Sequence, residues 1–291
     1  MLQRIIVASS RIRADVEPLV GLLQNLPVQQ AYLVHCVESV LPWPSRDQAA
    51  LSRARTEMQR WVEEVRPQTA VPIEPIVRLG IPAQQLIQVA QETDADTIVM
   101  GALVGLPREE FFLGSTSLET IRYSHTHMLI LHPDDSDQVS GGGLQRPLLD
   151  HVLFPTDFSD YSMMAFEDLL GLAERGLQRV NLLHVQDVTR IEPYLIDRLA
   201  EFDATDNKRL EQMAERLRQR GVDVEFRVEL GIPEQSIVKT AENYDVSCVA
   251  IGSRGRTPTQ LLSWGSVSER VVRAETHPVL VLRHRNHDQT E

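Results

Sequence analysis

The chain has 291 residues, of which 42% are hydrophobic and 24% are charged, a composition typical of a globular protein. Its formal net charge of −12 disfavours a nucleic-acid or anionic-membrane surface, because both require a basic face. The charge does not exclude a polyanionic nucleotide, since backbone N–H groups alone can bind phosphate. The sequence offers neither a membrane-spanning apolar run nor a signal peptide, so we expect a cytoplasmic protein.

The first half alternates apolar strand patterns with helical ones. Amphipathic stripes predict helices from Val16 to Leu26, from Leu51 to Val65, and over residues 82–91, and a fourth after a glycine segment near Gly101. Short apolar runs between them predict strands at residues 5–8, 31–37, 73–77, 98–100 and 128–131. Cys36 lies in one of these runs, and we expect a buried free thiol there in a reducing compartment.

The second half repeats this order. Strands are expected at residues 152–154, 180–185, 222–228, 248–251 and 279–282, with Cys248 as a second buried free thiol. Continuous apolar strands between amphipathic helices indicate a parallel sheet that helices cover on both faces. Residues 222–228 alternate instead, as in an edge strand with one wetter face.

An internal repeat relates the two halves. Leu79-Gly80-Ile81-Pro82 returns 151 positions later as Leu230-Gly231-Ile232-Pro233, and the same offset relates Gly101 and Gly114-Ser115 to Gly252 and Gly265-Ser266. So long a period indicates a duplicated domain and not a solenoid repeat. We therefore predict one domain over 1–135, a glycine-rich polar linker over 136–147 and a second domain over 148–291.

A candidate ligand site lies at the predicted carboxyl ends of the second half's strands, where open α/β sheets bind ligands. Pro155-Thr156-Asp157 follows the first strand, Val185 ends the second, and Gly252 follows the fourth, next to Ile251. We expect the Asp157 carboxylate to accept hydrogen bonds from ribose hydroxyls and the backbone near Val185 to contact a base edge.

A glycine segment in the same half is suited to phosphates. Gly252 and Gly255 can adopt positive φ and let backbone N–H groups approach an oxyanion closely. Gly265-Ser266-Val267-Ser268 precedes a helical run, which predicts Ser266 or Ser268 as the N-cap of a helix whose free N–H groups face the loop. Arg254 and Arg256 flank Gly255, either as solvated loop charges or as a clamp on phosphate.

These residues resemble the universal stress protein family. Gly252, Gly255, Gly265 and Ser266 match the family's G-x2-G-x9-G-[ST] nucleotide motif without a gap, and residues 154–159, 182–185 and 277–282 are similar to its strand motifs. The resemblance covers nearly the whole chain twice. It implies two tandem flavodoxin-like domains of the HUP type, each with a five-stranded parallel sheet of order 3-2-1-4-5. It further implies ATP, with or without Mg²⁺, bound by the matching second-half residues.

The first half departs from this motif at two places. Ser9-Ser10-Arg11 stands where the second half has Thr156-Asp157-Phe158, and Val104 replaces Gly255. A β-branched residue at positive φ is a genuine outlier, so the first loop must take another path or lose tight phosphate contacts. We therefore expect a degenerate first domain that does not bind ATP well.

We thus expect a cytoplasmic, ATP-binding stress-response regulator with at most weak ATP hydrolysis, since the positioning groups for phosphoryl transfer are missing. A nucleotide-free scaffold or small-ligand carrier and a slow ATPase are the alternatives. The resemblance also implies that domains pair through their last strands, Met128–Leu131 and Val279–Leu282, which would form a pseudo-dimer within the chain. Whether whole chains form a homodimer is left open, and no catalytic or metal-binding residues are expected.

Overall fold

The computed structural model describes residues 1–9, 16–38, 44–101, 114–132, 144, 146–189, 199–254 and 264–283. The chain divides into two compact units, Met1–Pro147 and Leu148–Glu291. Of the predicted linker, 136–147, only Leu144, Arg146 and Pro147 lie within the described residues. The Leu144 carbonyl oxygen accepts a hydrogen bond from the Asn25 side chain at 2.8 Å, so this residue packs within the first unit.

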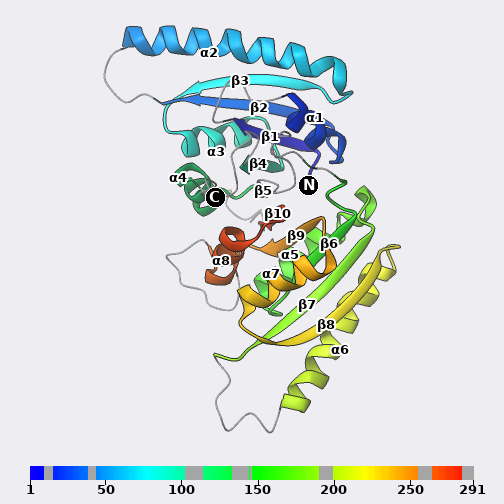
Figure 1. The fold of residues 1–291 in the computed structure, drawn as a ribbon. Coiled ribbons are helices and arrows are strands. Elements are labelled where there is room, and N and C mark those ends of the chain that lie inside the picture. Colours follow the sequence, from blue (N-terminus) through cyan, green and yellow to red (C-terminus); the bar gives the residue numbers. More distant parts are fainter. Residues whose placement is uncertain are drawn as a thin grey trace, which may run out of the picture. The chain divides into compact units, whose positions relative to one another are not determined.

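The first unit is a parallel α/β sheet with the strand order β3-β2-β1-β4-β5 (Figure 1). Helices α1 and α2 contact each other, as do α3 and α4, and Figure 1 shows α2 and α3 on opposite sides of the sheet. The strands are β1 (Arg4–Ser9), β2 (Gln30–Val37), β3 (Ile73–Leu79), β4 (Thr97–Gly101) and β5 (His127–Leu131). The helices are α1 (Val16–Gln24), α2 (Pro44–Val65), the 3₁₀ turn η1 (Arg66–Gln68), α3 (Pro82–Glu92) and α4 (Ser115–Tyr123).

The second unit repeats this architecture, with the order β8-β7-β6-β9-β10 and all strands parallel. Its strands are β6 (His151–Pro155), β7 (Arg179–Asp187), β8 (Asp223–Gly231), β9 (Cys248–Gly252) and β10 (Val279–Leu282). Its helices are α5 (Asp160–Leu170), the 3₁₀ turn η3 (Ala173–Arg175), α6 (Leu199–Arg218), α7 (Pro233–Tyr244) and α8 (Ser266–Ala274). A bidentate ion pair of 2.7 Å between Arg216 and Glu167 joins α6 to α5, and α7 packs beside α8.

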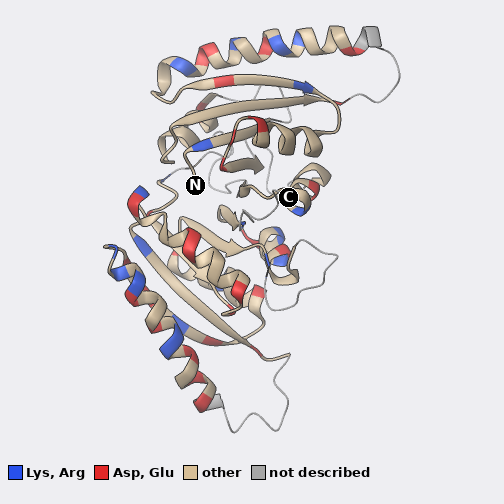
Figure 2. Ribbon diagram, turned by 180° about the vertical axis from the view of Figure 1, so that it is seen from behind, with Lys and Arg blue, Asp and Glu red and all other residues tan. Residues whose placement is uncertain are grey.

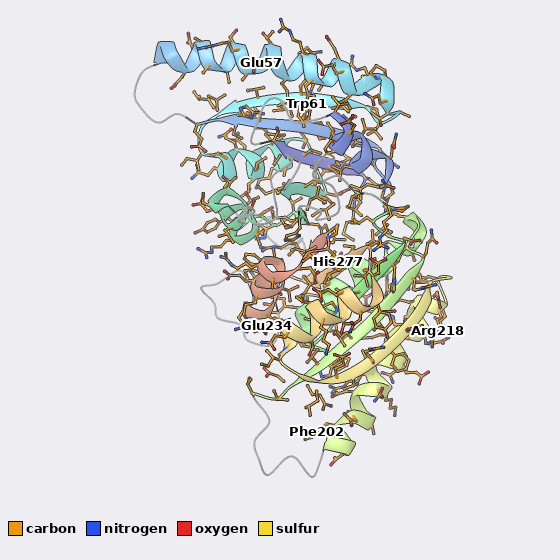
Figure 3. The ribbon with its side chains drawn as sticks, in the orientation of Figure 1. Glu57, Trp61, Phe202, Arg218, Glu234 and His277 are labelled. Atoms are coloured by element: carbon orange, nitrogen blue, oxygen red, sulfur yellow. The ribbon has the colours of Figure 1, made fainter. Side chains whose placement is uncertain are left out.

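Both units confirm the predicted flavodoxin-like fold, with the strand order 3-2-1-4-5 in each. The central strands are buried on both faces, and Figure 2 shows the charged residues mainly on the helices and outer strands. Trp61 on α2 is buried against the sheet and belongs to the core of the first unit (Figure 3). No described helix is long and apolar enough to cross a membrane. How the last strands of the two units pair remains a prediction.

Strands β7 and β8 extend beyond their predicted ends at residues 185 and 228. Val185 does not end its strand, because β7 continues through Gln186 and Asp187, which pair with Leu230 and Gly231 of β8. The polar character of Gln186 and Asp187 hid this extension. Long-range strand pairing, and not local propensity, decides where these strands end.

The two glycines that end the equivalent fourth strands have different conformations. Gly101 has φ +119°, and a Cβ atom there would lie 2.1 Å from the Leu131 carbonyl oxygen. Gly252 is not among the described glycines with positive φ, so it does not use the conformation that glycine makes accessible at this position. A Cβ atom at Gly252 would instead lie 3.3 Å from the Ala165 Cβ, so glycine here allows close packing of α5 against β9. The two units therefore leave the sheet differently at the same point of the repeat.

Gly101→Ala is expected to lower the free energy of unfolding by about 2–4 kcal/mol, because alanine is strained at this φ and its Cβ would collide with Leu131. Urea unfolding followed by circular dichroism measures the change. Gly114→Ser is the matched control, since its side chain enters open space at a helix N-cap. Equal stability of the two variants would contradict this assignment of strain.

Both cysteines are free, and Cys248 is buried as predicted, whereas Cys36 is only half-buried. Both should be unreactive in the folded protein at neutral pH. Burial raises the pKa of the Cys36 thiol to about 11 and that of the Cys248 thiol to about 12, so both remain protonated near neutral pH. Titration with a chromogenic disulfide reagent at neutral pH should show negligible reaction before unfolding and two thiols in urea. Reaction should accelerate as the pH rises toward 11, whereas fast labelling of the native protein at neutral pH would show that the thiols are accessible.

Candidate functional site

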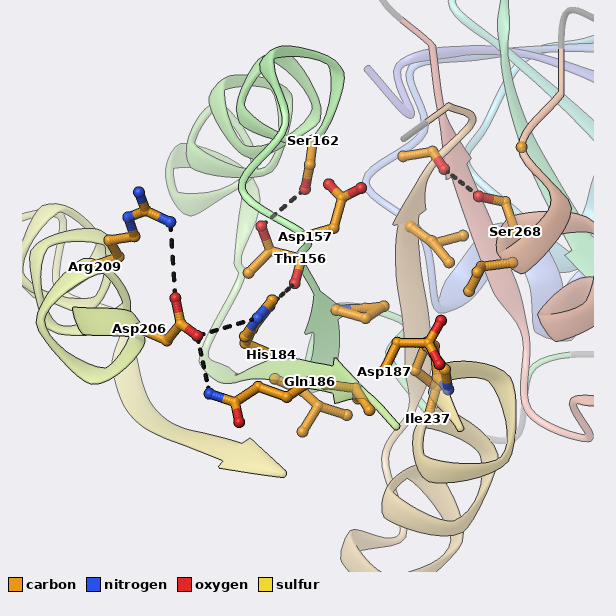
Figure 4. Close-up of a pocket in the computed structure, with 18 of the residues that line it drawn as sticks. Thr156, Asp157, Ser162, His184, Gln186, Asp187, Asp206, Arg209, Ile237 and Ser268 are labelled. Atoms are coloured by element: carbon orange, nitrogen blue, oxygen red, sulfur yellow. Dashed lines mark hydrogen bonds and ion pairs between the residues drawn. The ribbon is translucent and has the colours of Figure 1, made fainter. Parts of the chain in front are cut away.

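A pocket of about 630 Å³ opens at the carboxyl ends of β6, β7 and β9 in the second unit (Figure 4). This is the edge at which parallel α/β sheets bind ligands. The walls come from the strand ends, the starts of α6, α7 and α8, and Ser162 of α5. Apolar side chains line part of the pocket, namely Pro155, Leu183, Val185, Phe202, Pro233, Ile237, Ile251 and Val267.

The structure brings the predicted site residues together around this pocket. The residues that line it are Pro155, Thr156, Asp157, Val185, Ile251, Gly252, Gly265, Ser266, Val267 and Ser268. Gly255 and Arg256 lie outside the described residues. Arg254 also lines the pocket, with its guanidinium 5.4 Å from the centre of the Tyr161 ring.

Hydrogen bonds hold the end of β6 in a fixed conformation. The Thr156 amide donates to Leu183 O at 2.8 Å, and the Thr156 and Ser162 hydroxyls are 2.9 Å apart. The Asp157 Oδ1 accepts hydrogen bonds from the Ser159 amide and hydroxyl, at 3.0 and 2.6 Å. The turn that begins α5 therefore sets the orientation of the Asp157 carboxylate.

The start of α8 presents backbone amides to the pocket. Gly265 is the N-cap, and no side chain caps the helix, so the prediction of Ser266 or Ser268 at this position was wrong. The Ser268 hydroxyl instead donates to Gly252 O at 2.7 Å (Figure 4). The first helical hydrogen bond runs from the Glu269 amide to Gly265 O, so the amides of residues 266–268 have no acceptor within the helix. Such a helix start is a potential anion-binding site.

The charges around this helix start favour an anion. Arg254 lies beside the first turn. Burial, together with the nearby Arg254 charge, lowers the pKa of Arg283 to about 10, which still leaves the Arg283 guanidinium charged at neutral pH. Glu269, the acidic residue of the first turn, is bound by Arg273 one turn later at 3.0 Å. Its negative charge is thus partly compensated on the helix itself.

The opposite wall of the pocket is a polar network between β7 and α6. The Asp206 carboxylate accepts a hydrogen bond from the Gln186 side-chain amide at 3.1 Å, and it lies 3.5 Å from His184 Nε2 and 3.7 Å from Arg209 (Figure 4). His184 Nδ1 lies 2.7 Å from Thr156 O, and because a carbonyl oxygen can only accept, Nδ1 carries the proton. The Phe158 ring packs 4.5 Å from the His184 ring.

The first unit keeps part of this arrangement. His35 Nδ1 lies 2.9 Å from Ser9 O, so Ser9 occupies the position that Thr156 has in the second unit. Ser10, Arg11 and Val104 lie outside the described residues, so the predicted departures of the first half are not tested at those positions. Within the described residues, no group of His, Cys, Asp and Glu side chains could hold a metal ion.

The sequence did not identify the wall that α6 contributes. Its lining residues are Glu201, Phe202, Thr205, Asp206 and Arg209. Their spacing of three and four residues places them on one face of the helix, and this was the available signal. The sequence does not reveal that this face covers the strand ends, since only the sheet order brings α6 to the pocket.

A protein-family model described as the universal stress protein family matches residues 31–132 and 149–283. Among curated relatives, universal stress protein MJ0577 of Methanocaldococcus jannaschii is 31% identical over 154 residues, which cover 46% of this chain and 95% of the relative. Universal stress protein YxiE of Bacillus subtilis is 28% identical over 148 residues, which cover 47% of this chain and 100% of the relative. Each of these relatives thus corresponds in length to about half of the chain.

Among solved structures, a universal stress protein from Archaeoglobus fulgidus matches with a TM-score of 0.71 and 18% identity, covering 98% of both chains. A similarity at this level of identity supports the fold, and it extends over both units.

Asp206→Ala is expected to lower the free energy of unfolding by about 2 kcal/mol, because the buried Gln186 amide loses its acceptor and His184 Nε2 loses the carboxylate beside it. Glu211→Ala removes a more exposed carboxylate of the same helix, 4.0 Å from Arg218, and should change stability by less than about 0.5 kcal/mol. Urea unfolding measures both changes. Similar losses in the two variants would show that the Asp206 network does not stabilise the unit.

Proposed function

The chain belongs to the universal stress protein family, and from this premise we propose that its second unit binds ATP, with or without Mg²⁺, in the pocket at the carboxyl ends of β6, β7 and β9. The protein then acts as a cytoplasmic stress-response regulator, with nucleotide occupancy as its signal. Its ligand is a nucleotide and not a nucleic acid, in keeping with the net charge of −12.

The observation that carries this proposal is the uncapped start of α8 at one end of an otherwise partly apolar pocket. Three amides in sequence, those of Ser266, Val267 and Ser268, lack helical acceptors, and Arg254 adds a positive charge beside them. A polyphosphate supplies the acceptors that these amides need. We call the apolar surface of Pro155, Val185 and Ile251 the apolar slot. The combination of an anion site and this apolar slot fits a nucleotide better than a purely apolar ligand.

The remaining pocket groups suit the rest of the nucleotide. Asp157 lies at the end of β6, where its turn holds the carboxylate in a fixed orientation for a ribose hydroxyl. The side chains of Pro155, Val185 and Ile251 offer apolar surface to the base, and the backbone near Val185 offers hydrogen bonds to its edge. In this arrangement the base lies at β7, the ribose at the end of β6 and the phosphates at the start of α8.

The first unit is proposed to serve as a structural or partner-docking copy. Gly101, the last residue of β4, has φ +119°, whereas Gly252 at the equivalent end of β9 does not have positive φ, so the two strand ends differ in backbone conformation. The first unit also has Ser10 and Val104 at the places of Asp157 and Gly255. These differences remove the ribose carboxylate and one glycine of the motif.

ATP at a hundredfold excess over its Kd is expected to stabilise the full chain by about 2.7 kcal/mol, because it binds only the folded state. For a unit of this size that corresponds to a rise in Tm of about 5–10 °C in differential scanning calorimetry. Gly255→Val copies the residue of the first half and should abolish the rise. Val104→Gly, the reverse change in the first unit, is the matched control and should leave it unchanged.

An unchanged Tm of the natural chain in millimolar ATP would contradict the proposal. Mass spectrometry of protein denatured directly from cells separates it from a nucleotide-free scaffold or small-ligand carrier. A retained adenine nucleotide supports ATP binding, whereas a retained apolar ligand without nucleotide supports the alternative.

A further inference from the structure

Two hydrogen bonds join the ends of the segment between β9 and α8. The Ser268 hydroxyl donates to Gly252 O at 2.7 Å, and the Gly265 amide donates to Ser253 O at 2.8 Å. We call these two bonds the loop clasp. From the structure we propose that Ser268 is a positioning residue, which through the loop clasp sets the first-turn amides of α8 to bind the polyphosphate of a nucleotide. This inference rests on the proposed nucleotide binding.

Ser268 lines the pocket, but its side chain is buried and its hydroxyl makes a hydrogen bond within the protein. It is 5% exposed, and its hydroxyl is committed to a carbonyl oxygen of the preceding strand. Gly252 is itself fixed in the sheet, because it pairs with Leu282 of β10, and the next amide, that of Ser253, donates to Leu282 O at 3.0 Å. Ser268 therefore ties the start of α8 to a strand whose own position is set by its neighbour.

The start of α8 lies in van der Waals range of the residues that follow β9. A Cβ atom at Gly265 would lie 3.5 Å from the Ser268 Oγ, from Ser253 O and from the Arg254 Cα. Farther along the helix, Arg270 Nε binds Glu234 Oε1 at 3.1 Å and joins α8 to the start of α7, where Figure 3 labels Glu234. Removing the Ser268 hydroxyl thus leaves the helix packed but frees its first turn, which carries the amides.

The first unit offers an internal comparison. Ser117 occupies the position equivalent to Ser268, and Gly114 caps α4 as Gly265 caps α8. Ser117 is half-buried, and within the described part of the chain it makes no hydrogen bond with Gly101, which has φ +119°. The same serine is thus present in both units, but it links helix and strand only in the unit proposed to bind ATP.

The test compares ATP with adenosine, because only ATP uses the amides of α8. Isothermal titration calorimetry on the full chain should show that Ser268→Ala weakens ATP binding by about tenfold, the effect of one well-placed hydrogen bond. Adenosine binding should change by less than about twofold, since Asp157 and the apolar slot are unaffected. Ser117→Ala is the matched control and should leave both affinities unchanged.

An equal fold loss of affinity for ATP and adenosine leaves the ratio of the two affinities unchanged. This result would overturn the positioning role of Ser268 without contradicting ATP binding. Failure of the natural chain to bind either ligand would overturn the proposed function itself. Should Ser268→Ala not fold, Ser268→Cys keeps the size of the side chain and weakens the donor, and the same fall in the ratio is expected. Ser268→Thr retains the hydroxyl and should keep the ratio near that of the natural chain.

Discussion

The hydrogen bond from the Ser268 hydroxyl to Gly252 O holds the start of α8 against the end of β9, and the proposed site depends on this contact. Serine at a helix start ordinarily caps the helix and satisfies its own free amides. Here the side chain is used for a tertiary contact, and glycine occupies the N-cap position. The amides of the first turn are therefore left without a side-chain cap, at the edge of a pocket about 630 Å³ in volume. A fixed helix start of this kind has the properties that an anion site requires.

The duplication makes the effect of single positions visible. Both units have the same strand order, the same helix order and an equivalent histidine that binds the carbonyl at the end of the first strand, His35 to Ser9 and His184 to Thr156. They differ at the end of the fourth strand, where Gly101 has positive φ and Gly252 does not. Both copies have the same buried sheet, while the proposed ligand chemistry depends on a few loop and helix-start residues. Function can thus be lost in one copy without loss of the fold.

Much of this could be predicted from the sequence. Apolar strands such as Val279–Leu282, separated by amphipathic helices, predicted the covered parallel sheets, because burial on both faces leaves no alternation in the pattern. The repeat and the glycine motif predicted which strand ends would meet. What could not be predicted are features that arise from contacts distant in sequence. Strand β7 extends through Gln186 and Asp187 because β8 supplies partners, and Ser268 does not cap its helix because Gly252 O accepts its hydroxyl. The pocket wall that α6 forms with Asp206 could not be predicted either, because only the order of the strands in the sheet brings this helix to the pocket.

The central claim is that main-chain amides of α8 in the second unit bind the phosphates of ATP. A crystal structure of the full chain with ATP tests it most directly. We expect nucleotide in the second unit with phosphate oxygens within hydrogen-bonding distance of the amide nitrogens of Ser266, Val267 and Ser268, and with ribose at Asp157. Density for ATP elsewhere, phosphates directed into solvent away from α8, or equal occupancy in both units would contradict it.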